Sequence, residues 1–390
     1  MGILLFMMCP ALAICYIITQ AYSGKYKSLT ALSLSIAMVA LFTPPFADIY
    51  RHTLMYFEFQ NYGNAIIQSN GHDFIFYTLT NICAQNNIPF EYISFLFVFV
   101  CYQVSFYLFK QILKNSIITQ HDRQKTFYIF LCFLFMVPFI AIINGLRMAT
   151  AAYIALLAWN FAYRKKFLKS SLIFIIALCT HFGSWIFLPI IIYTFISKIK
   201  IHKTTFIIVA LCLMVAGGIL LQLLPSSFIE AIQMEDKVTG YMVNNEERFD
   251  DTMSSNGRIA MYLERLPLIF VAVMALINRL RLNDRDLSII YMAIWLSLLY
   301  HPFIVLFQRY AFLAVPLLIF LCVQDQSSRS QSTKTIKILV ASCMIMTMAY
   351  MYGYRTTFLN TKYHKMFYPS LITIPTTDTH ELFKDALIPK

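Results

Sequence analysis

The chain has 390 residues, of which 59% are hydrophobic and only 13% are charged, and its mean hydropathy is +0.65. Soluble domains carry about 25% charged residues, so this composition excludes a protein that faces water on all sides. Apolar runs recur along the whole chain, which predicts an all-α polytopic membrane protein. The net charge of +12 does not indicate nucleic-acid binding, because the basic residues separate the apolar runs and form no patch.

About twelve membrane crossings are predicted within a single integral domain, residues 1–352. A first outer loop at 44–89, with a weakly amphipathic piece around Phe74 to Ala84, and a large hydrophilic loop at 225–264 interrupt the crossings, and a tail at 353–390 follows them. In chain order the crossings are Ile3–Tyr22, Leu29–Thr43, Phe90–Phe109, Phe127–Ile143, Met148–Tyr163, two within Ser170–Ser197, Thr204–Leu224, Leu266–Ile277, Leu287–Phe307, Tyr310–Val323 and Thr335–Tyr352.

The segment Ser170–Ser197 does not fit simple spanning. It has 28 residues between two basic gaps, so the chain must leave and return to the same side within it. Two full crossings of a hydrocarbon core about 30 Å thick need about 40 helical residues. We therefore expect a short, re-entrant-like hairpin with its tip at Thr180-His181-Phe182-Gly183.

The distribution of charge predicts the orientation. Alternate gaps hold 19 Lys and Arg against four acids, and the opposite side holds 12 against 15. The positive-inside rule places the first set in the cytoplasm, so both termini are expected outside. The cytoplasmic gaps are Lys25/Lys27, Lys110–Lys125, Arg164–Lys169, Lys198–Lys203, Arg279–Arg285 and Arg329–Lys337.

Several arginines on the outer side adjoin apolar runs, where a guanidinium needs a partner or a function. Guanidinium suits bidentate phosphate recognition, so these arginines predict a diphosphate site; snorkelling to headgroups or pairing with loop acids is the alternative. They are Arg147, Arg258, Arg265 and Arg309. His181, at the hairpin tip, can move a proton near neutral pH, and a buried neutral structural histidine is its alternative.

The outer loops offer groups suited to a sugar. Asp48, Tyr50 and Arg51 lie in the first loop and Tyr241 in the second; a carboxylate can bind hydroxyls and a ring can cover a sugar face, while an interfacial aromatic belt is the alternative for the tyrosines. Asp48 is a second candidate base beside His181. A lone Asp48 is a weak metal signal, so neither a metal nor a cofactor is predicted.

These residues resemble the EpsG-like branch of the Wzy-type O-antigen and capsular polysaccharide polymerases. The resemblance rests on the segment NGLRMATAA at 144–152, the segment LCTHFGS at 178–184, Asp48-x-Tyr50, Gly257-Arg258 and Arg309-Tyr310. It departs from the family pattern at Met148, where Gln is common after the Arg.

The resemblance implies a metal-independent glycosyltransferase of the bacterial inner membrane. A growing glycan would leave undecaprenyl diphosphate and join a lipid-linked repeat unit on the periplasmic face. Its implied partners are the lipid-linked oligosaccharide, membrane lipid and a chain-length regulator protein. The catalytic candidates are His181 and Asp48, with Arg147, Arg258, Arg265 and Arg309 for the diphosphate and Tyr50, Arg51 and Tyr241 for the glycan.

Three other readings stay open at this point. A lipid-linked oligosaccharide flippase or transporter would place ionisable residues in the middle of the bundle. A polyprenyl-phosphate-dependent transferase of a single sugar would favour paired acids in the first outer loop, where the candidates Asp48 and Glu58 are ten residues apart. A membrane acyltransferase would also use a membrane histidine, but with arginines on the cytoplasmic side.

Overall fold

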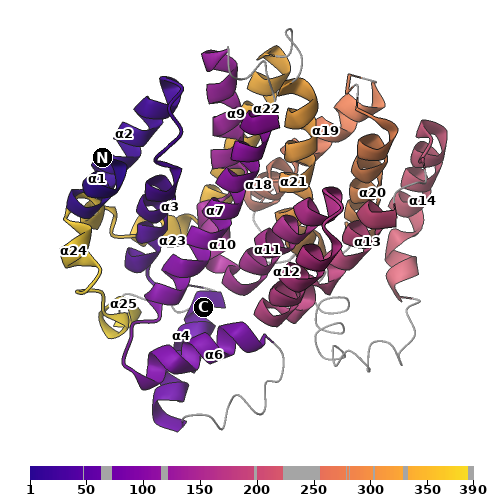
Figure 1. Ribbon diagram of the computed structural model, residues 1–390. Helices are drawn as coiled ribbons and strands as arrows, with labels where there is room; N and C mark the ends of the chain where they lie inside the picture. The colour runs from indigo at the N-terminus through magenta and orange to yellow at the C-terminus, as the bar shows by residue number, and fades with distance from the viewer. Residues whose placement is uncertain are drawn as a thin grey trace.

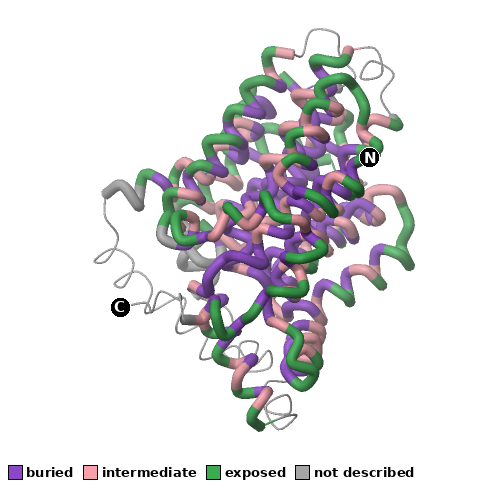
Figure 2. Tube along the Cα trace, turned by 90° about the vertical axis from the view of Figure 1, so that its left-hand side faces the viewer, coloured by how far each residue is buried: buried purple, intermediate pink, exposed green. Residues whose placement is uncertain are grey.

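The computed structural model is built from helices, with no β-strand among the residues that it describes (Figure 1). Buried residues run through the middle of the bundle and exposed ones along its outer helices (Figure 2). The structure describes residues 1–46, 48–62, 73–115, 122–196, 200–222, 255–277, 279–280, 282–301, 304–327 and 333–384.

The described helices divide between the two halves of the chain. The first half of the chain contains α1 (Gly2–Met8), α2 (Pro10–Tyr22), α3 (Leu29–Ala37), η1 (Met38–Phe42), α4 (Asp48–Tyr62), α6 (Phe74–Gln85), α7 (Glu91–Asn115), α9 (Arg123–Phe135), α10 (Phe139–Asn144) and α11 (Leu146–Tyr163). The second half contains α12 (Phe167–Thr180), η2 (Phe182–Phe187), α13 (Leu188–Ile196), α14 (Lys203–Gln222), α18 (Ser255–Leu263), α19 (Leu266–Leu276), α20 (Asp284–Tyr300), α21 (Ile304–Ser327), α22 (Thr333–Gly353), α23 (Arg355–Asn360), η3 (Tyr363–Phe367), α24 (Ser370–Thr373) and α25 (Thr379–Lys384).

Four helical segments of the described chain are long and apolar enough to cross a membrane: Glu91–Lys114, Arg123–Asn144, Phe307–Gln324 and Thr333–Gly353. Six shorter apolar helical segments accompany them, each with 10 to 17 residues. The all-helical, multi-pass architecture predicted from the sequence is therefore present. The expected number of about twelve crossings is not confirmed, because many apolar segments are shorter than the roughly 20 residues that a full crossing needs.

Helix α11 lies at the centre of the bundle and packs against α7, α12, α13 and α21. Its alanines explain this position, since small side chains let neighbouring helices approach closely. Ala149, Ala152 and Ala155 are fully buried, and so is Trp159, whose indole N–H donates to Thr194 on α13 at 3.0 Å. The core thus holds α11 and fixes the positions of both its ends.

The basic gaps gather at one end of the bundle. Lys200 pairs with Asp284 at 2.8 Å, and Arg285 donates to the carbonyl oxygens of Tyr163 (2.9 Å) and Thr194 (3.3 Å). The Lys337 ammonium lies 5.1 Å from the ring centroid of Tyr128. These contacts bring together chain segments that the charge distribution assigns to the cytoplasmic side, and we call this the basic end.

The predicted hairpin is short on both sides of its tip. Helix α12 has 14 residues, and η2 with α13 has 15. At about 1.5 Å per α-helical residue and about 2.0 Å per 3-10 residue, the arms are roughly 21 Å and 26 Å long, less than the hydrocarbon thickness. The arms meet at His181, whose backbone is extended (φ −153°, ψ 116°). His181 therefore lies at the tip, as the sequence predicts.

The first outer loop, predicted mainly as loop, contains two helices, α4 and α6. Helix α4 was missed because its polar residues lower the average hydropathy. It still buries one face through Ile49, Thr53, Tyr56 and Phe59, which recur every three or four residues. Helix α6 corresponds to the amphipathic piece expected around Phe74 to Ala84. Both helices pack together at the end of the molecule opposite the basic end (Figure 1).

The last part of the predicted outer loop at 225–264 is also helical. Residues 255–263 form α18, which packs on α22 and buries Ala260. The apolar run of this helix is only five residues long, 259–263, which is too short to predict a helix from the sequence. Residues 223–254 lie outside the described part of the chain.

The C-terminal tail, uninformative in the sequence, packs back on the outer helices. Tyr50 of α4 stacks on Phe383 with ring centroids 5.2 Å apart. The Tyr92 hydroxyl donates to the carbonyl oxygen of Ile374 at 2.6 Å, and the Thr379 hydroxyl donates to Glu91 Oε2 at 2.5 Å. Residues 370–384 therefore lie at the same end of the molecule as α4 and the start of α7.

Candidate active site

A buried carboxylate, Asp73, organises the outer end of the bundle. It precedes α6, is 4% exposed, and has a left-handed backbone with φ of 62°. A residue other than glycine in this region costs about 1 kcal/mol or more, although Asp tolerates it better than most. The Asp73 carboxylate accepts hydrogen bonds from three residues on two chain segments, and these contacts compensate the cost.

His181 is the first partner of Asp73. Its Nδ1 lies 2.9 Å from both carboxylate oxygens, and the backbone N–H of Phe182 donates to Oδ1 at 2.7 Å. The break in the helix at the hairpin tip produces this geometry, because the extended backbone of His181 turns its ring and the next amide toward the same carboxylate.

Arg147 is the second partner. It lies in the first turn of α11, and its Nη1 donates to Asp73 Oδ2 at 2.7 Å and to the Tyr77 hydroxyl at 3.0 Å. Its guanidinium carbon is 5.4 Å from the ring centroid of Phe76. Among the described residues the hydrogen bonds of Arg147 all use Nη1, and the side chain is 22% exposed. Nη2 and Nε thus make no hydrogen bond among the described residues.

The charges fix the protonation state of this cluster. Burial opposes ionisation of Asp73, but the hydrogen bond from His181 and the charge of Arg147 lower the pKa of Asp73 to about 2. An ionised carboxylate can only accept hydrogen bonds, so Nδ1 of His181 carries the proton. The other ring nitrogen, Nε2, then has the lone pair and can act as a base.

Gly183 keeps Nε2 accessible. A Cβ atom at this position would lie 2.9 Å from Nε2 of His181 and 3.3 Å from Cδ2. No ordinary Cβ contact is that short, so even alanine would press on the imidazole edge that bears the lone pair. The glycine two residues after His181 in the segment LCTHFGS therefore has a physical reason.

Two further residues act on the same cluster. His52 of α4 is buried, packs edge-on against Phe76, and lies within electrostatic reach of Asp73, Arg147 and His181. Burial, followed by the charge of Arg147, lowers the pKa of His52 well below its ordinary value, so His52 is neutral. Arg309 of α21 is close enough to His181 for its charge to act on the imidazole.

Arg265 belongs to a second group of polar residues. Its Nη1 lies 2.5 Å from Nε2 of His301, and its guanidinium carbon is 4.3 Å from the ring centroid of Phe307. The neighbouring Glu264 accepts a hydrogen bond from Gln308 at 3.3 Å, and burial raises the pKa of Glu264 to about 8. Gln308 precedes Arg309 on α21, so this helix contributes one residue to the group around Glu264 and one residue near His181.

The remaining predicted site residues have other placements. Asp48 forms an ion pair with Arg51 on its own helix at 2.5 Å, with side chains 39% and 76% exposed. The ring of Phe383 covers one face of the Tyr50 ring. The side chain of Arg258 and the whole of Tyr241 lie outside the described residues.

Comparison with known proteins bears on this arrangement. A sequence profile described as the EpsG family matches residues 28–365, which is nearly the whole chain. The chain belongs to the EpsG family. No match is found among curated proteins or among solved structures. EpsG membership and the apolar helices together indicate a multi-pass membrane protein of the polysaccharide polymerase-like glycosyltransferase type.

The sequence of this EpsG-family chain pointed to Arg147 and His181 but not to the residue that joins them. Asp73 lies in no motif and in a stretch of mixed polarity. One signal was available, because Asp73 is the only carboxylate between Glu58 and Glu91. An arginine beside apolar surface needs an acid, and this is the only acid that the second half of the first outer loop offers.

Proposed function

We propose that the chain is a polysaccharide polymerase of the bacterial inner membrane. It transfers a glycan from undecaprenyl diphosphate to a lipid-linked acceptor repeat unit on the periplasmic face, without a metal. The observation that carries this proposal is the contact of Arg147 and His181 with one carboxylate, Asp73, at the outer end of the bundle. This arrangement places a candidate base beside a candidate anion-binding group.

The chemistry assigns a role to each group. An acceptor hydroxyl attacks the anomeric carbon of the donor glycan, the new glycosidic bond forms, and the bond to the diphosphate oxygen breaks. The hydroxyl proton passes to Nε2 of His181, while Asp73 holds the imidazole by Nδ1 and stabilises the imidazolium that results. The departing diphosphate is stabilised by the free nitrogens of Arg147 and by Arg309.

The balance of charge supports an anionic substrate. Asp73 neutralises the charge of Arg147, and His52 and His181 are neutral before the reaction, so the unused donors of Arg147 remain for an anion, with the positive charge of Arg309 near His181. Guanidinium donors in a water-poor site bind an oxyanion more strongly than they would in water. A site with this balance favours a diphosphate over a neutral sugar alone.

Deletion of the gene, with complementation, tests the proposal. The expected result is loss of the long-chain ladder of surface polysaccharide on a gel, with one repeat unit retained. Loss of every repeat unit would instead indicate a flippase or a transferase that adds a single sugar. Purified protein given lipid-linked repeat units must also lengthen them, and unchanged chain length with folded protein would refute the proposal.

A further inference from the structure

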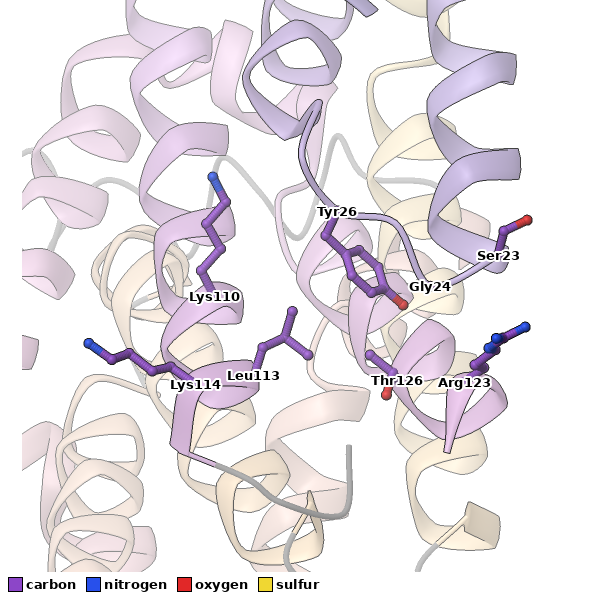
Figure 3. Close-up of a pocket in the computed structure, with 8 residues that line it drawn as sticks. All are labelled: Ser23, Gly24, Tyr26, Lys110, Leu113, Lys114, Arg123 and Thr126. Atoms are coloured by element: carbon purple, nitrogen blue, oxygen red, sulfur yellow. The ribbon is translucent and has the colours of Figure 1, made fainter. Parts of the chain in front are cut away.

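A cavity lies at the basic end, opposite the end of the bundle that holds the candidate active site. Its volume is about 540 Å³, within the range of about 300 to 1,000 Å³ found for small-ligand sites. It lies between the turn after α2, the end of α7 and the start of α9 (Figure 3). Its lining residues are Ser23, Gly24, Tyr26, Lys110, Leu113, Lys114, Arg123 and Thr126.

The lining is strongly positive. Lys110 and Lys114 extend from α7 on one side, and Arg123 lies on α9 on the other, with Tyr26 and Leu113 between them (Figure 3). All three cations are exposed, and none of the eight lining residues is an acid. Among the described residues no ion pair of Lys110, Lys114 or Arg123 occurs. Three unpaired cations around one opening repel each other unless an anion joins them.

The nearest acid in the sequence does not neutralise this charge fully. Asp122 uses Oδ1 to accept the backbone N–H of Lys125 at 2.9 Å, and so it caps the first turn of α9. The residues that connect α7 to α9 in the sequence, 116–121, include no acid. The positive charge of the pocket therefore exceeds its negative charge.

The hydroxyl groups in the pocket add one free donor. Ser23 donates to the carbonyl oxygen of Thr19 at 3.1 Å, and Thr126 donates to that of Asp122 at 2.8 Å. The Tyr26 hydroxyl oxygen is buried and has no hydrogen-bond partner among the described residues. A buried hydroxyl without a partner costs about 1 to 3 kcal/mol, and a ligand oxygen above it would remove that cost.

The position of the pocket relative to the membrane indicates that its anion comes from a lipid. Two helical segments long enough to cross a membrane, Glu91–Lys114 and Arg123–Asn144, end and begin at its rim. Their ends mark the boundary between hydrocarbon and headgroups. Leu113 gives the lining an apolar edge on which an acyl chain can lie. Basic pockets between membrane helices on the cytoplasmic side are suited to the headgroups of anionic lipids.

We propose that this pocket binds the phosphate headgroup of an anionic phospholipid of the inner leaflet. Lys110, Lys114 and Arg123 surround the phosphate, and the Tyr26 hydroxyl donates to one of its oxygens. The bound lipid links the first hairpin, α2 to α3, to α7 and α9. The site is separate from the glycan chemistry and does not depend on the proposed function.

Native mass spectrometry of the purified chain tests this site. The chain is mixed with phosphatidylglycerol or with phosphatidylcholine, and the bound fraction is measured against lipid concentration. The test variant carries Lys110→Ala, Lys114→Ala and Arg123→Ala. A matched control carries Lys166→Ala, Lys169→Ala and Lys203→Ala, which removes the same charge from three exposed basic residues that do not line the pocket.

We expect tight binding of phosphatidylglycerol and weak binding of phosphatidylcholine. Each basic residue near an anionic surface contributes about fivefold in affinity, so the triple variant should lose roughly 100-fold. The control variant should lose less than about fivefold. Tyr26→Phe, which leaves all charges in place, should lose roughly threefold to tenfold through the missing donor. Melting temperatures without added lipid verify that each variant is folded.

Competition separates the two sources of phosphate. Inorganic phosphate or glycerol phosphate at millimolar concentration should not displace the lipid, because neither has an acyl chain for the edge at Leu113. Displacement by these soluble anions would make the ligand a free phosphate and overturn the lipid assignment. Equal losses in the two triple variants, or equal binding of the two lipids, would overturn the site itself.

Discussion

Charged side chains are buried and hydrogen-bonded at the outer end of the bundle but exposed at the basic end. At the outer end, Asp73 is buried and bonded to Arg147 and His181, so the charges are held in one geometry. At the basic end, Lys110, Lys114 and Arg123 are exposed around an open pocket. A fixed geometry suits a chemical step, because the groups need no reorganisation during the reaction. Exposed cations suit the capture of an anion, for which total charge matters more than direction.

The largest effect is expected at His181. If it is the base, His181→Ala should lower the rate of chain lengthening by about 100-fold to 10,000-fold. His202→Ala, an exposed histidine of the basic end, should leave the rate unchanged. The measurement is the chain-length distribution made per amount of folded membrane protein. Polysaccharide chains of normal length from well-expressed His181→Ala would show that His181 is not the base.

Arg147 should show that the shape of the cation matters at the outer end. Arg147→Ala should lower the rate roughly 100-fold, as expected when a group that stabilises leaving-group charge is lost. Arg147→Lys keeps the ion pair with Asp73 but lacks the planar group with additional donors, so we expect a loss of about tenfold. A lysine variant with full activity would show that charge alone suffices, as at the basic end.

Gly183 tests the access to Nε2. Gly183→Ala places a Cβ 2.9 Å from this nitrogen, and we expect a loss of rate of about tenfold with normal protein abundance. Gly353→Ala is the matched control, because the nearest atom to its Cβ would be Oε1 of Glu264 at 4.0 Å. Equal rates for the two variants would show that the imidazole edge facing Gly183 is not used.

The sequence pointed to the two partners of Asp73 but not to Asp73 itself. Arg147 and His181 were found because each interrupts an apolar run, and that interruption is visible in one dimension. Asp73 was missed because its role comes from contacts with residues 74 and 108 positions away along the chain. The bonded cluster required the tertiary packing of α6, α11 and α12, which no local pattern encodes.

The helices show the same limit. Long apolar segments such as the one that forms α22 were placed within about two residues, since hydropathy alone defines them. Helices α4 and α18 lie in segments predicted as loops, because α4 buries only one face and α18 has an apolar run of only five residues. The number of about twelve crossings is not confirmed for the described residues, because an apolar composition does not by itself give a helix long enough to cross: α19 is apolar throughout but has only 11 residues.

The smallest effect concerns the stability contributed by Glu264. Its folded-state pKa of about 8 lies above that of an unfolded carboxyl, so the folded chain retains a proton that the unfolded chain releases. The contribution to stability is therefore most favourable at acidic pH, and it falls as the pH rises toward 8. Glu264→Gln removes this dependence on pH. When the pH is raised from 5.5 to 8.5, the melting temperature of this variant should fall by roughly 2 to 4 °C less than that of the wild type.

Glu58→Gln is the control for that measurement, since Glu58 is exposed on α4. It should follow the pH dependence of the wild type. A Glu264→Gln variant whose melting curve shifts with pH as much as the wild type would show that Glu264 is ionised and hydrated at neutral pH.

A double-mutant cycle of Asp73 and His181 tests most directly whether these residues act as one unit. Asp73→Asn, His181→Ala and the double variant are compared for the rate of chain lengthening by purified protein, with melting temperatures as the control for folding. If Asp73 acts by holding His181, the double variant should be no slower than His181→Ala alone, because the carboxylate has nothing left to orient. Two losses of rate that multiply in the double variant would show that Asp73 and His181 act independently, and would contradict the site described for this chain.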